Sequence, residues 1–253
     1  MPDARKLALF CEGHDDYAVL EWLVQHGHLP AELDSCRPPK GDVLRGGADG
    51  MIGDVVPWLK TGVSALVVRD IDDLDLGGVV RWFEKSIADH RLDAKQMPEP
   101  EACPPGVLFF HVTAPTAAAR PARVAVVAVG DPTIAKLTPC CDVTRFAVDD
   151  YLLRLLVRED VYGAISELKD APHTKAFAKL ARFAASLRDN GLPVQTSKRV
   201  LGLLHGITGF RASPTEFAKR VLDNAKKALP AAELAAVIES LVEPLRFAAR
   251  TLL

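Results

Sequence analysis

The run VSALVVR, residues 63–69, constrains the fold more than any other stretch, because it is apolar on both faces of a strand. Such a strand is typical of a parallel sheet that is covered by helices on both sides. Three further runs have the length and composition of strands: residues 6–11, 107–113 and 123–129. Helical spacing of apolar residues lies between or beside them, over residues 16–26, 51–60 and 78–90. This alternation predicts an α/β fold with a central, mostly parallel sheet flanked by helices.

The second part of the chain has a different pattern. A further helix is predicted within residues 146–157, and from about residue 160 onward no strand is predicted. Helices are predicted there over residues 174–189, 213–229 and 231–252, the last of them bent at Pro244. The sequence therefore predicts an α/β domain over residues 1–157 and an all-α C-terminal region over residues 158–253.

Charge is distributed unevenly along the 253 residues, although the net charge is only −2. Residues 1–150 carry 15 Lys and Arg against 23 Asp and Glu, whereas residues 151–253 carry 16 against 10. An acidic first part suits a cation site, and a basic second part suits contacts with phosphates. An ordinary excess of lysine on helical surfaces is the competing explanation for the basic second part.

Cysteine usage and hydropathy indicate the compartment. The five cysteines form no C-x-x-C pattern, which favours reduced thiols in a cytoplasmic protein. No apolar run approaches the length of a transmembrane helix, and the first residues lack the pattern of a signal peptide. We therefore expect no membrane partner.

Carboxylates follow two of the predicted strands. Glu12 comes directly after the first strand in LALFCEGHDD, and Asp70 and Asp72 follow VSALVVR. The carboxyl ends of parallel strands meet at one edge of the sheet, where ligands bind in open α/β folds. Two acids placed two residues apart on extended backbone point to the same side, which suits a hard cation such as Mg²⁺. A solvated turn in which Asp side chains cap backbone N–H groups explains the same D-x-D.

Together these residues resemble the toprim domain of topoisomerases and primases, in which a Glu ends the first strand and Asp-x-Asp ends a later one. EGHDD further resembles the form found in overcoming-lysogenization-defect (OLD) nucleases and in small stand-alone toprim-related prokaryotic proteins, which makes Asp16 the matching acid. FAVDDYLLRLL resembles an acidic helix start late in those domains, where Asp149 replaces a Glu. The resemblance covers about residues 5–157 and implies a toprim-like Rossmannoid fold. Capping of a helix N-terminus is the competing explanation for Asp16.

The resemblance implies a site for Mg²⁺ or Mn²⁺ at which Glu12, Asp70 and Asp72 are catalytic. Asp16 and Asp149 complete the implied set of metal ligands. It also implies nucleic acid as the partner, DNA in preference to RNA, and nicking or cleavage of a phosphodiester as the reaction.

Two features depart from the family's pattern. Arg69 stands immediately before the D-x-D, where it could pair with an acid or contact a phosphate, and only Lys136 is available as a weak match for the catalytic lysine of the nucleases. The alternative is therefore a catalytically silent module that binds metal, nucleic acid or a partner protein, and a homodimer is left open as well.

Other site classes fit the sequence poorly. The glycine-rich LRGGADGMIG, residues 44–53, matches neither the P-loop nor the dinucleotide-binding pattern. The histidines form no pair at helical spacing, which disfavours zinc, and there is no G-x-S-x-G nucleophile elbow. A phosphatase with a D-x-D nucleophile is a weaker reading, because here the motif follows a later strand.

Overall fold

The structure, a computed structural model, describes residues 7–35, 47–71, 74–115, 121–168, 171–211 and 213–253. The chain forms two compact units, residues 1–129 together with 242–253, and residues 130–241. These limits differ from the predicted domains, because the first boundary follows Val129 and the end of the chain returns to the first unit. The helix expected within residues 146–157 belongs to the second unit and contacts other helices of that unit, so the boundary falls before it.

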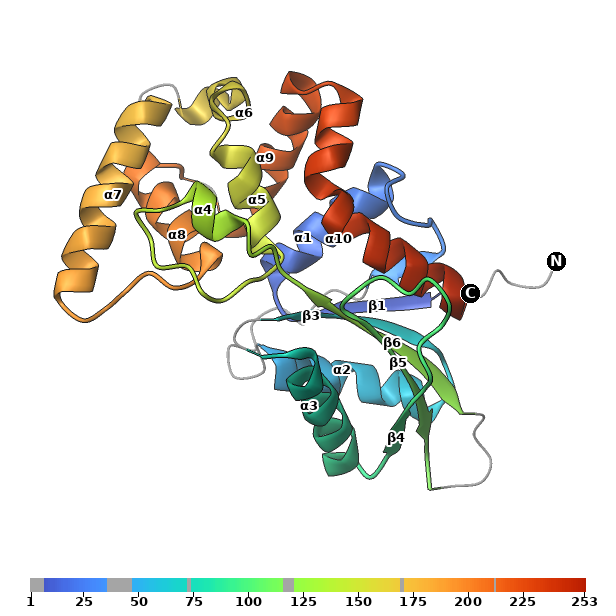
Figure 1. Ribbon diagram of the computed structural model, residues 1–253. Coiled ribbons are helices and arrows are strands. Elements are labelled where there is room, and N and C mark those ends of the chain that lie inside the picture. Colours follow the sequence, from blue (N-terminus) through green and yellow to red (C-terminus); the bar gives the residue numbers. More distant parts are fainter. Residues whose placement is uncertain (1–6, 36–46, 72–73, 116–120, 169–170, 212) are drawn as a thin grey trace. The chain divides into compact units, whose positions relative to one another are not determined.

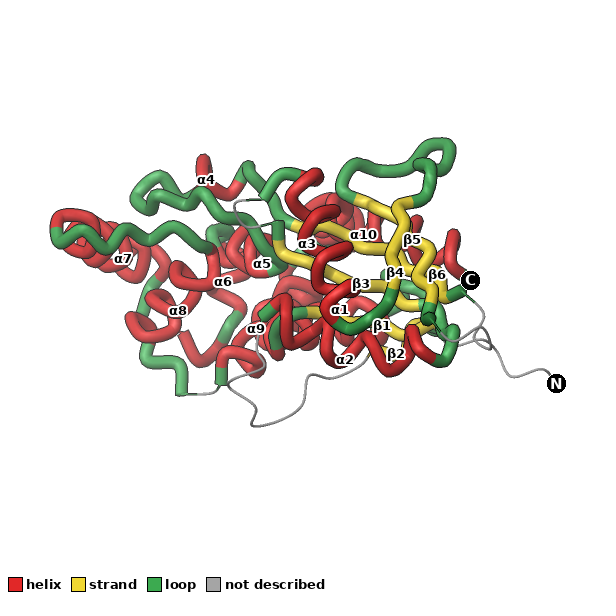
Figure 2. The backbone as a smooth tube through the Cα atoms, turned by 90° about the horizontal axis from the view of Figure 1, so that it is seen from below, coloured by secondary structure: helices red, strands yellow, loops and turns green. Residues whose placement is uncertain are grey.

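The first unit is built on a mostly parallel sheet, as the sequence predicted (Figures 1 and 2). Within the described residues the sheet has six strands in the order β2-β1-β3-β6-β5-β4. The pairs β1 with β2, β1 with β3 and β3 with β6 are parallel, and β5 is antiparallel to both of its neighbours. The strands are β1 (Leu7–Cys11), β2 (Leu33–Ser35), β3 (Ala65–Asp70), β4 (Asp93–Gln96), β5 (Val107–Thr113) and β6 (Ala122–Val129).

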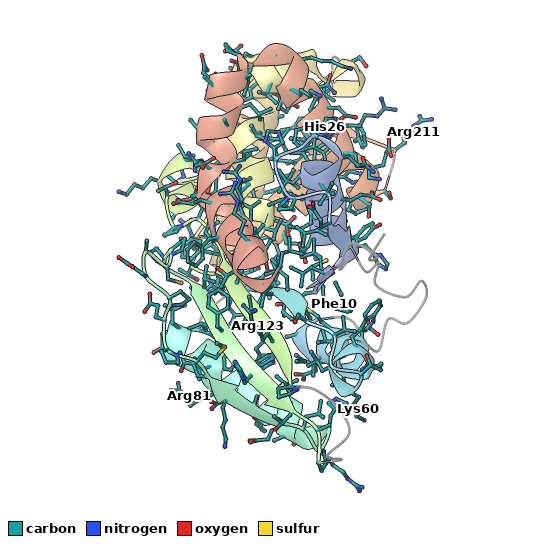
Figure 3. The ribbon with its side chains drawn as sticks, turned by 90° about the vertical axis from the view of Figure 1, so that its right-hand side faces the viewer. Phe10, His26, Lys60, Arg81, Arg123 and Arg211 are labelled. Atoms are coloured by element: carbon teal, nitrogen blue, oxygen red, sulfur yellow. The ribbon has the colours of Figure 1, made fainter. Side chains whose placement is uncertain are left out.

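Alternate residues of the strands face opposite helix layers. Phe10 and Val67 belong to one hydrophobic cluster with residues of α2 (Ala48–Lys60) and α3 (Leu76–Asp89), which cover one face of the sheet (Figure 1). Phe10, labelled in Figure 3, contacts Trp58 of α2 edge to face, with ring centroids 6.2 Å apart. The period of two along each strand thus supplies apolar side chains to both layers, which is what a doubly covered sheet requires.

The opposite face of the sheet is covered by α1 (His14–Gln25) and by the last turns of α10 (Ala231–Leu252), as Figure 1 shows. Phe109 of β5 contacts Phe247 of α10, with ring centroids 6.3 Å apart. Arg123 of β6, labelled in Figure 3, donates a hydrogen bond to the carbonyl oxygen of Thr251. These contacts join the end of the chain to the first unit.

The second unit is helical. Its helices are α4 (Ile134–Leu137), α5 (Asp149–Leu156), α6 (Glu159–Ala164), the 3₁₀ turn η1 (Ser166–Leu168), α7 (His173–Asp189), α8 (Ser197–Thr208), α9 (Pro214–Ala228) and the first part of α10. The Ser213 side chain accepts a hydrogen bond from the Glu216 backbone N–H at 3.2 Å and caps α9, as the sequence SPTE predicts. Among the described residues, no helix is both long enough and apolar enough to span a membrane.

Some elements differ from the prediction. β2 and β4 are short and lie at the sheet edges, where few apolar residues are needed, so the apolar pattern predicts neither of them. α2 begins at Ala48 and continues through Pro57. Gly53 and Pro57 both lie on the exposed side of this helix, where water can satisfy the carbonyl group that Pro57 leaves without a donor.

Gly106, the residue before β5, lies very close to the backbone of β6, and its substitution tests the pairing of these two strands. Its φ is +86°, and a Cβ at this position would lie 2.9 Å from the carbonyl oxygen of Ala128. We expect Gly106→Ala to lower the free energy of unfolding by about 2–3 kcal/mol, because both the backbone conformation and the close approach become unfavourable. Urea denaturation would measure the loss.

Gly27→Ala is the matched control for this substitution. Gly27 has a φ of +74°, but nothing lies within 4 Å of the added Cβ, so only the backbone conformation is penalised, by about 1 kcal/mol. Equal losses in the two variants would contradict the importance of the close approach at Gly106.

Candidate functional site

The carboxyl ends of β1 and β3 meet at one edge of the sheet. These strands are parallel neighbours, with Cys11 opposite Val68, so the residues that follow them lie side by side. The backbone N–H of Asp70 donates a hydrogen bond of 3.1 Å to Oε1 of Glu12. Two of the acids chosen from the sequence, 58 positions apart, are thus brought together by strand pairing. Asp72 lies outside the described residues.

We call this edge of the sheet, with Glu12, Asp16 and Asp70, the acidic edge. Arg69 places a positive charge inside it. Its Nη1 forms an ion pair with Oε1 of Glu12 and also donates a hydrogen bond of 2.7 Å to the carbonyl oxygen of Asp70. The guanidinium lies 5.2 Å from the ring centroid of Trp82, within the range of a cation–π contact. Of the two roles that the sequence allowed for Arg69, pairing with an acid is the one seen.

Asp16 lies in the first turn of α1 and caps its N-terminus. Its Oδ2 accepts a hydrogen bond of 2.9 Å from the backbone N–H of Gly13, the residue before the helix. Negative charge is stabilised there by the helix dipole and by the N–H groups of the first turn. The capping explanation for Asp16 is therefore observed, and the carboxylate nevertheless contributes to the charge of the edge.

Burial and mutual repulsion shift the acid–base properties of the edge. The pKa of Glu12 is raised, first because burial disfavours its charged form and further because Asp16 is near, while Arg69 opposes the rise. The pKa of the Cys11 thiol is also raised, by burial and then by the charges of Asp16, Asp70 and Glu12. The edge therefore disfavours additional negative charge and holds Cys11 as a neutral thiol.

Among the described residues, the acidic edge offers carboxylate oxygens, which are the donors that Mg²⁺ prefers, but it holds no complete metal site. Mg²⁺ commonly takes only one or two protein carboxylates, and the second carboxylate oxygen of Glu12 accepts no hydrogen bond from any described residue. Across those same residues, however, no three His, Cys, Asp or Glu side chains form a group that could hold a metal ion. Arg69 already balances one negative charge there.

Asp149 belongs to the second unit, where it is buried at the first turn of α5. The neighbouring Asp150, which the sequence analysis does not single out, has a structural role as a buried hydrogen-bond acceptor. Oδ2 of Asp150 accepts hydrogen bonds from the backbone N–H groups of Asp131 (2.7 Å) and Ala147 (2.8 Å), and Oδ1 accepts one from Ser197 Oγ. Asp150 thus fixes a long loop and the start of α8 to α5.

An ion pair completes this buried network. Arg154 Nη1 lies 2.7 Å from Oδ2 of Asp131, and Oδ1 of Asp131 accepts hydrogen bonds from the backbone and hydroxyl of Thr133. Asp131 lies in Gly-Asp-Pro, a typical turn sequence, so the sequence predicts a turn at this residue but not its ion pair. Lys136, the weak match for a catalytic lysine, is in the short helix α4 of the same unit.

No family model matches the sequence, and no curated protein matches it. The structure is similar to the crystal structure of a hypothetical protein from Pyrococcus horikoshii OT3, with a TM-score of 0.53 and 14% sequence identity. The similarity covers 97% of this chain and 98% of that one, so it extends over nearly the whole length of the fold.

The ion pair between Arg69 and Glu12 is testable by a double-mutant cycle. With side-chain exposures of 9% and 13%, the pair is largely shielded from water. We expect Arg69→Met to lower the free energy of unfolding by about 2–3 kcal/mol, because it leaves a buried carboxylate uncompensated, and we expect Glu12→Gln to recover part of that loss in the double variant. Denaturant titration of the four proteins gives the coupling energy, and a coupling near zero would contradict a stabilising pair.

The buried Asp150 predicts a pH dependence of stability. Burial raises its pKa to about 6, above its usual value of 3.8. Between these two values the folded state holds more protons than the unfolded state, so the free energy of unfolding should fall by up to about 3 kcal/mol as the pH rises from 4 to 6. Urea denaturation at both pH values measures this slope.

Asp150→Asn is the informative variant. An amide can accept both backbone hydrogen bonds at its oxygen and donate to Ser197 Oγ, and it does not titrate. We expect it to remove the slope and to keep the fold, whereas Asp150→Ala should cost about 3 kcal/mol by leaving two buried N–H groups without an acceptor. Equal destabilisation by both variants would show that the charge itself is required.

Proposed function

We propose that this chain carries out metal-dependent phosphodiester chemistry on nucleic acid, with DNA nicking or cleavage as the reaction. The observation that carries the proposal is the hydrogen bond between the Asp70 backbone and the Glu12 carboxylate. It joins the carboxyl ends of two adjacent parallel strands, which is the edge of an open α/β sheet where ligands bind. The sequence resemblance to toprim nucleases supplies the reaction class.

Glu12, Asp70 and Asp72 would hold Mg²⁺ or Mn²⁺ at this edge, and the resemblance adds Asp16 and Asp149. When bound, such an ion neutralises phosphate charge and lowers the pKa of a coordinated water. Asp16 also has a structural role, because its carboxylate caps α1.

The chain's own side chains supply the remaining chemistry. Glu12, with its pKa raised by burial, suits proton acceptance near neutral pH better than an ordinary surface glutamate does. Arg69 holds one oxygen of Glu12 and leaves the other available for a proton. Its guanidinium is a suitable donor to a phosphate oxygen that enters the edge. In this arrangement Asp70 and Asp72 hold the ion, Glu12 is the proposed base instead of a metal ligand, and Arg69 is the proposed phosphate contact.

A specific observation favours the alternative, a catalytically silent toprim-like module that binds metal, nucleic acid or a partner protein. Arg69 already neutralises Glu12, so a divalent ion must compete with a cation covalently fixed in the chain. In either case we propose a cytoplasmic protein. Cys11, Cys103, Cys140 and Cys141 are free thiols, as a reducing compartment would keep them.

A plasmid-nicking assay tests the proposal. Supercoiled DNA is incubated with the protein and Mg²⁺ or Mn²⁺, and Asp70→Ala is compared with Asp89→Ala, which removes an exposed acid at the end of α3. We expect metal-dependent nicking by the wild type and by Asp89→Ala, and a loss of at least about 100-fold in Asp70→Ala, because removal of one electrostatic transition-state contact commonly costs that much.

Calorimetric titration with MnCl₂ separates the two candidates. Metal uptake that Asp70→Ala abolishes, with no nicking by any protein, would favour the silent module. Nicking that persists in Asp70→Ala or in the presence of EDTA would refute a carboxylate-bound metal as the catalyst.

A further inference from the structure

A groove lies on the surface of the second unit, between α7 and α8, which run beside each other (Figures 1 and 2). Its volume is about 590 Å³, within the range of cavities that hold small organic ligands. The lining residues are Lys179, Arg182, Phe183 and Ser186 of α7 and Gly206 and Ile207 of α8. None of them has a role in the acidic edge or in the buried network around Asp150.

The α7 wall of the groove is cationic. Lys179, Arg182 and Ser186 are spaced by three and four residues, so they lie on one face of the helix, and all three are exposed. Among the described residues, the one hydrogen bond that Arg182 donates is long, 3.4 Å, and goes to the carbonyl oxygen of Ala178 in its own helix. In the described part of the chain, neither Lys179 nor Arg182 forms an ion pair with a carboxylate.

This contrasts with other exposed arginines of the same unit. Arg188 lies 2.7 Å from Asp142, and Arg220 lies 3.1 Å from Glu216. The groove is thus a place where positive charge faces solvent uncompensated, which favours an anionic ligand.

An exposed aromatic ring stands beside these charges. Phe183 follows Arg182 directly, and 53% of its surface is exposed. A single exposed phenylalanine is ordinary, but one that lines a cationic groove provides a flat apolar surface on which a planar ring can stack.

The α8 side of the groove has little side-chain bulk, because glycines lie there. A Cβ added at Gly206 would meet nothing within 4 Å, and the same holds at Gly202, one turn earlier. Glycine inside a helix lowers stability relative to alanine. The two glycines therefore destabilise α8 slightly, and they leave its backbone on this exposed face accessible to a ligand.

We propose that this groove binds a single-stranded segment of nucleic acid, with Lys179 and Arg182 on phosphates and Phe183 stacked on a base. Cationic side chains along a groove combined with an exposed aromatic ring are how proteins hold single strands without reading sequence. An acidic peptide would use the same charges and has no need of the ring, so nucleic acid is the favoured occupant. This binding requires no metal and no cleavage at the acidic edge.

The test is fluorescence anisotropy of a fluorescein-labelled 12-mer of thymidylate with the full chain, in EDTA and at several salt concentrations. We expect Phe183→Ala and Phe183→Leu to weaken binding about tenfold, because stacking needs an aromatic face, and Phe183→Tyr to bind as the wild type does. The double variant Lys179→Ala/Arg182→Ala should reduce the slope of log K against log[salt] by about 1.4, the amount for two single-strand phosphate contacts.

Lys227→Ala is the matched control, since it removes an exposed charge of α9 in the same unit but outside the groove, and it should leave the slope unchanged. Circular dichroism checks that each variant is folded. Absence of binding by the wild type, or wild-type affinity in folded groove variants, would overturn the proposal, as would polyglutamate that competes as well as unlabelled thymidylate does.

EDTA keeps this result separate from the proposed chemistry. Asp70→Ala should bind the oligonucleotide as tightly as the wild type. Thus binding can fail while metal-dependent nicking succeeds, and nicking can fail while binding succeeds.

Discussion

The parallel pairing of β1 with β3 is the constraint on which the candidate site depends. Apolar side chains on both faces of these strands require a helix layer on each side, and both strands must then run through the interior of the sheet. Their carboxyl ends are therefore neighbours, and Glu12 meets the backbone of Asp70 there. The acidic edge is a consequence of how the core is covered.

Arg69 sets the charge balance of this edge. Burial removes water from the Glu12 carboxylate and the nearby Asp16 repels its charge, and both effects raise the pKa of Glu12. One guanidinium, held by an ion pair and by the ring of Trp82, offsets part of that cost. The same interaction therefore stabilises the fold and competes with any ligand that needs the Glu12 charge.

The second unit uses polar groups in two opposite ways. Asp150 is fully buried, and its acceptors are occupied by backbone N–H groups and by Ser197, so its role is to hold a loop and two helices together. Lys179 and Arg182 are exposed and have no acidic partner among the described residues. Burial separates a structural charge from one that is available to a ligand, although sequence alone shows both as charged residues on helices.

The sequence by itself determined the fold class, the main strands and helices, and the position of Glu12 and Asp70 at strand ends, because these follow from local periodicity and from the rule that parallel strands share a ligand-binding edge. Only the tertiary structure decided that Arg69 pairs with Glu12, that Asp150 is held by Ser197, and that the first unit ends at Val129. Each of these depends on residues far apart in the chain meeting in space. Periodicity reports which face of an element is buried, but it does not report which distant side chain lies against that face.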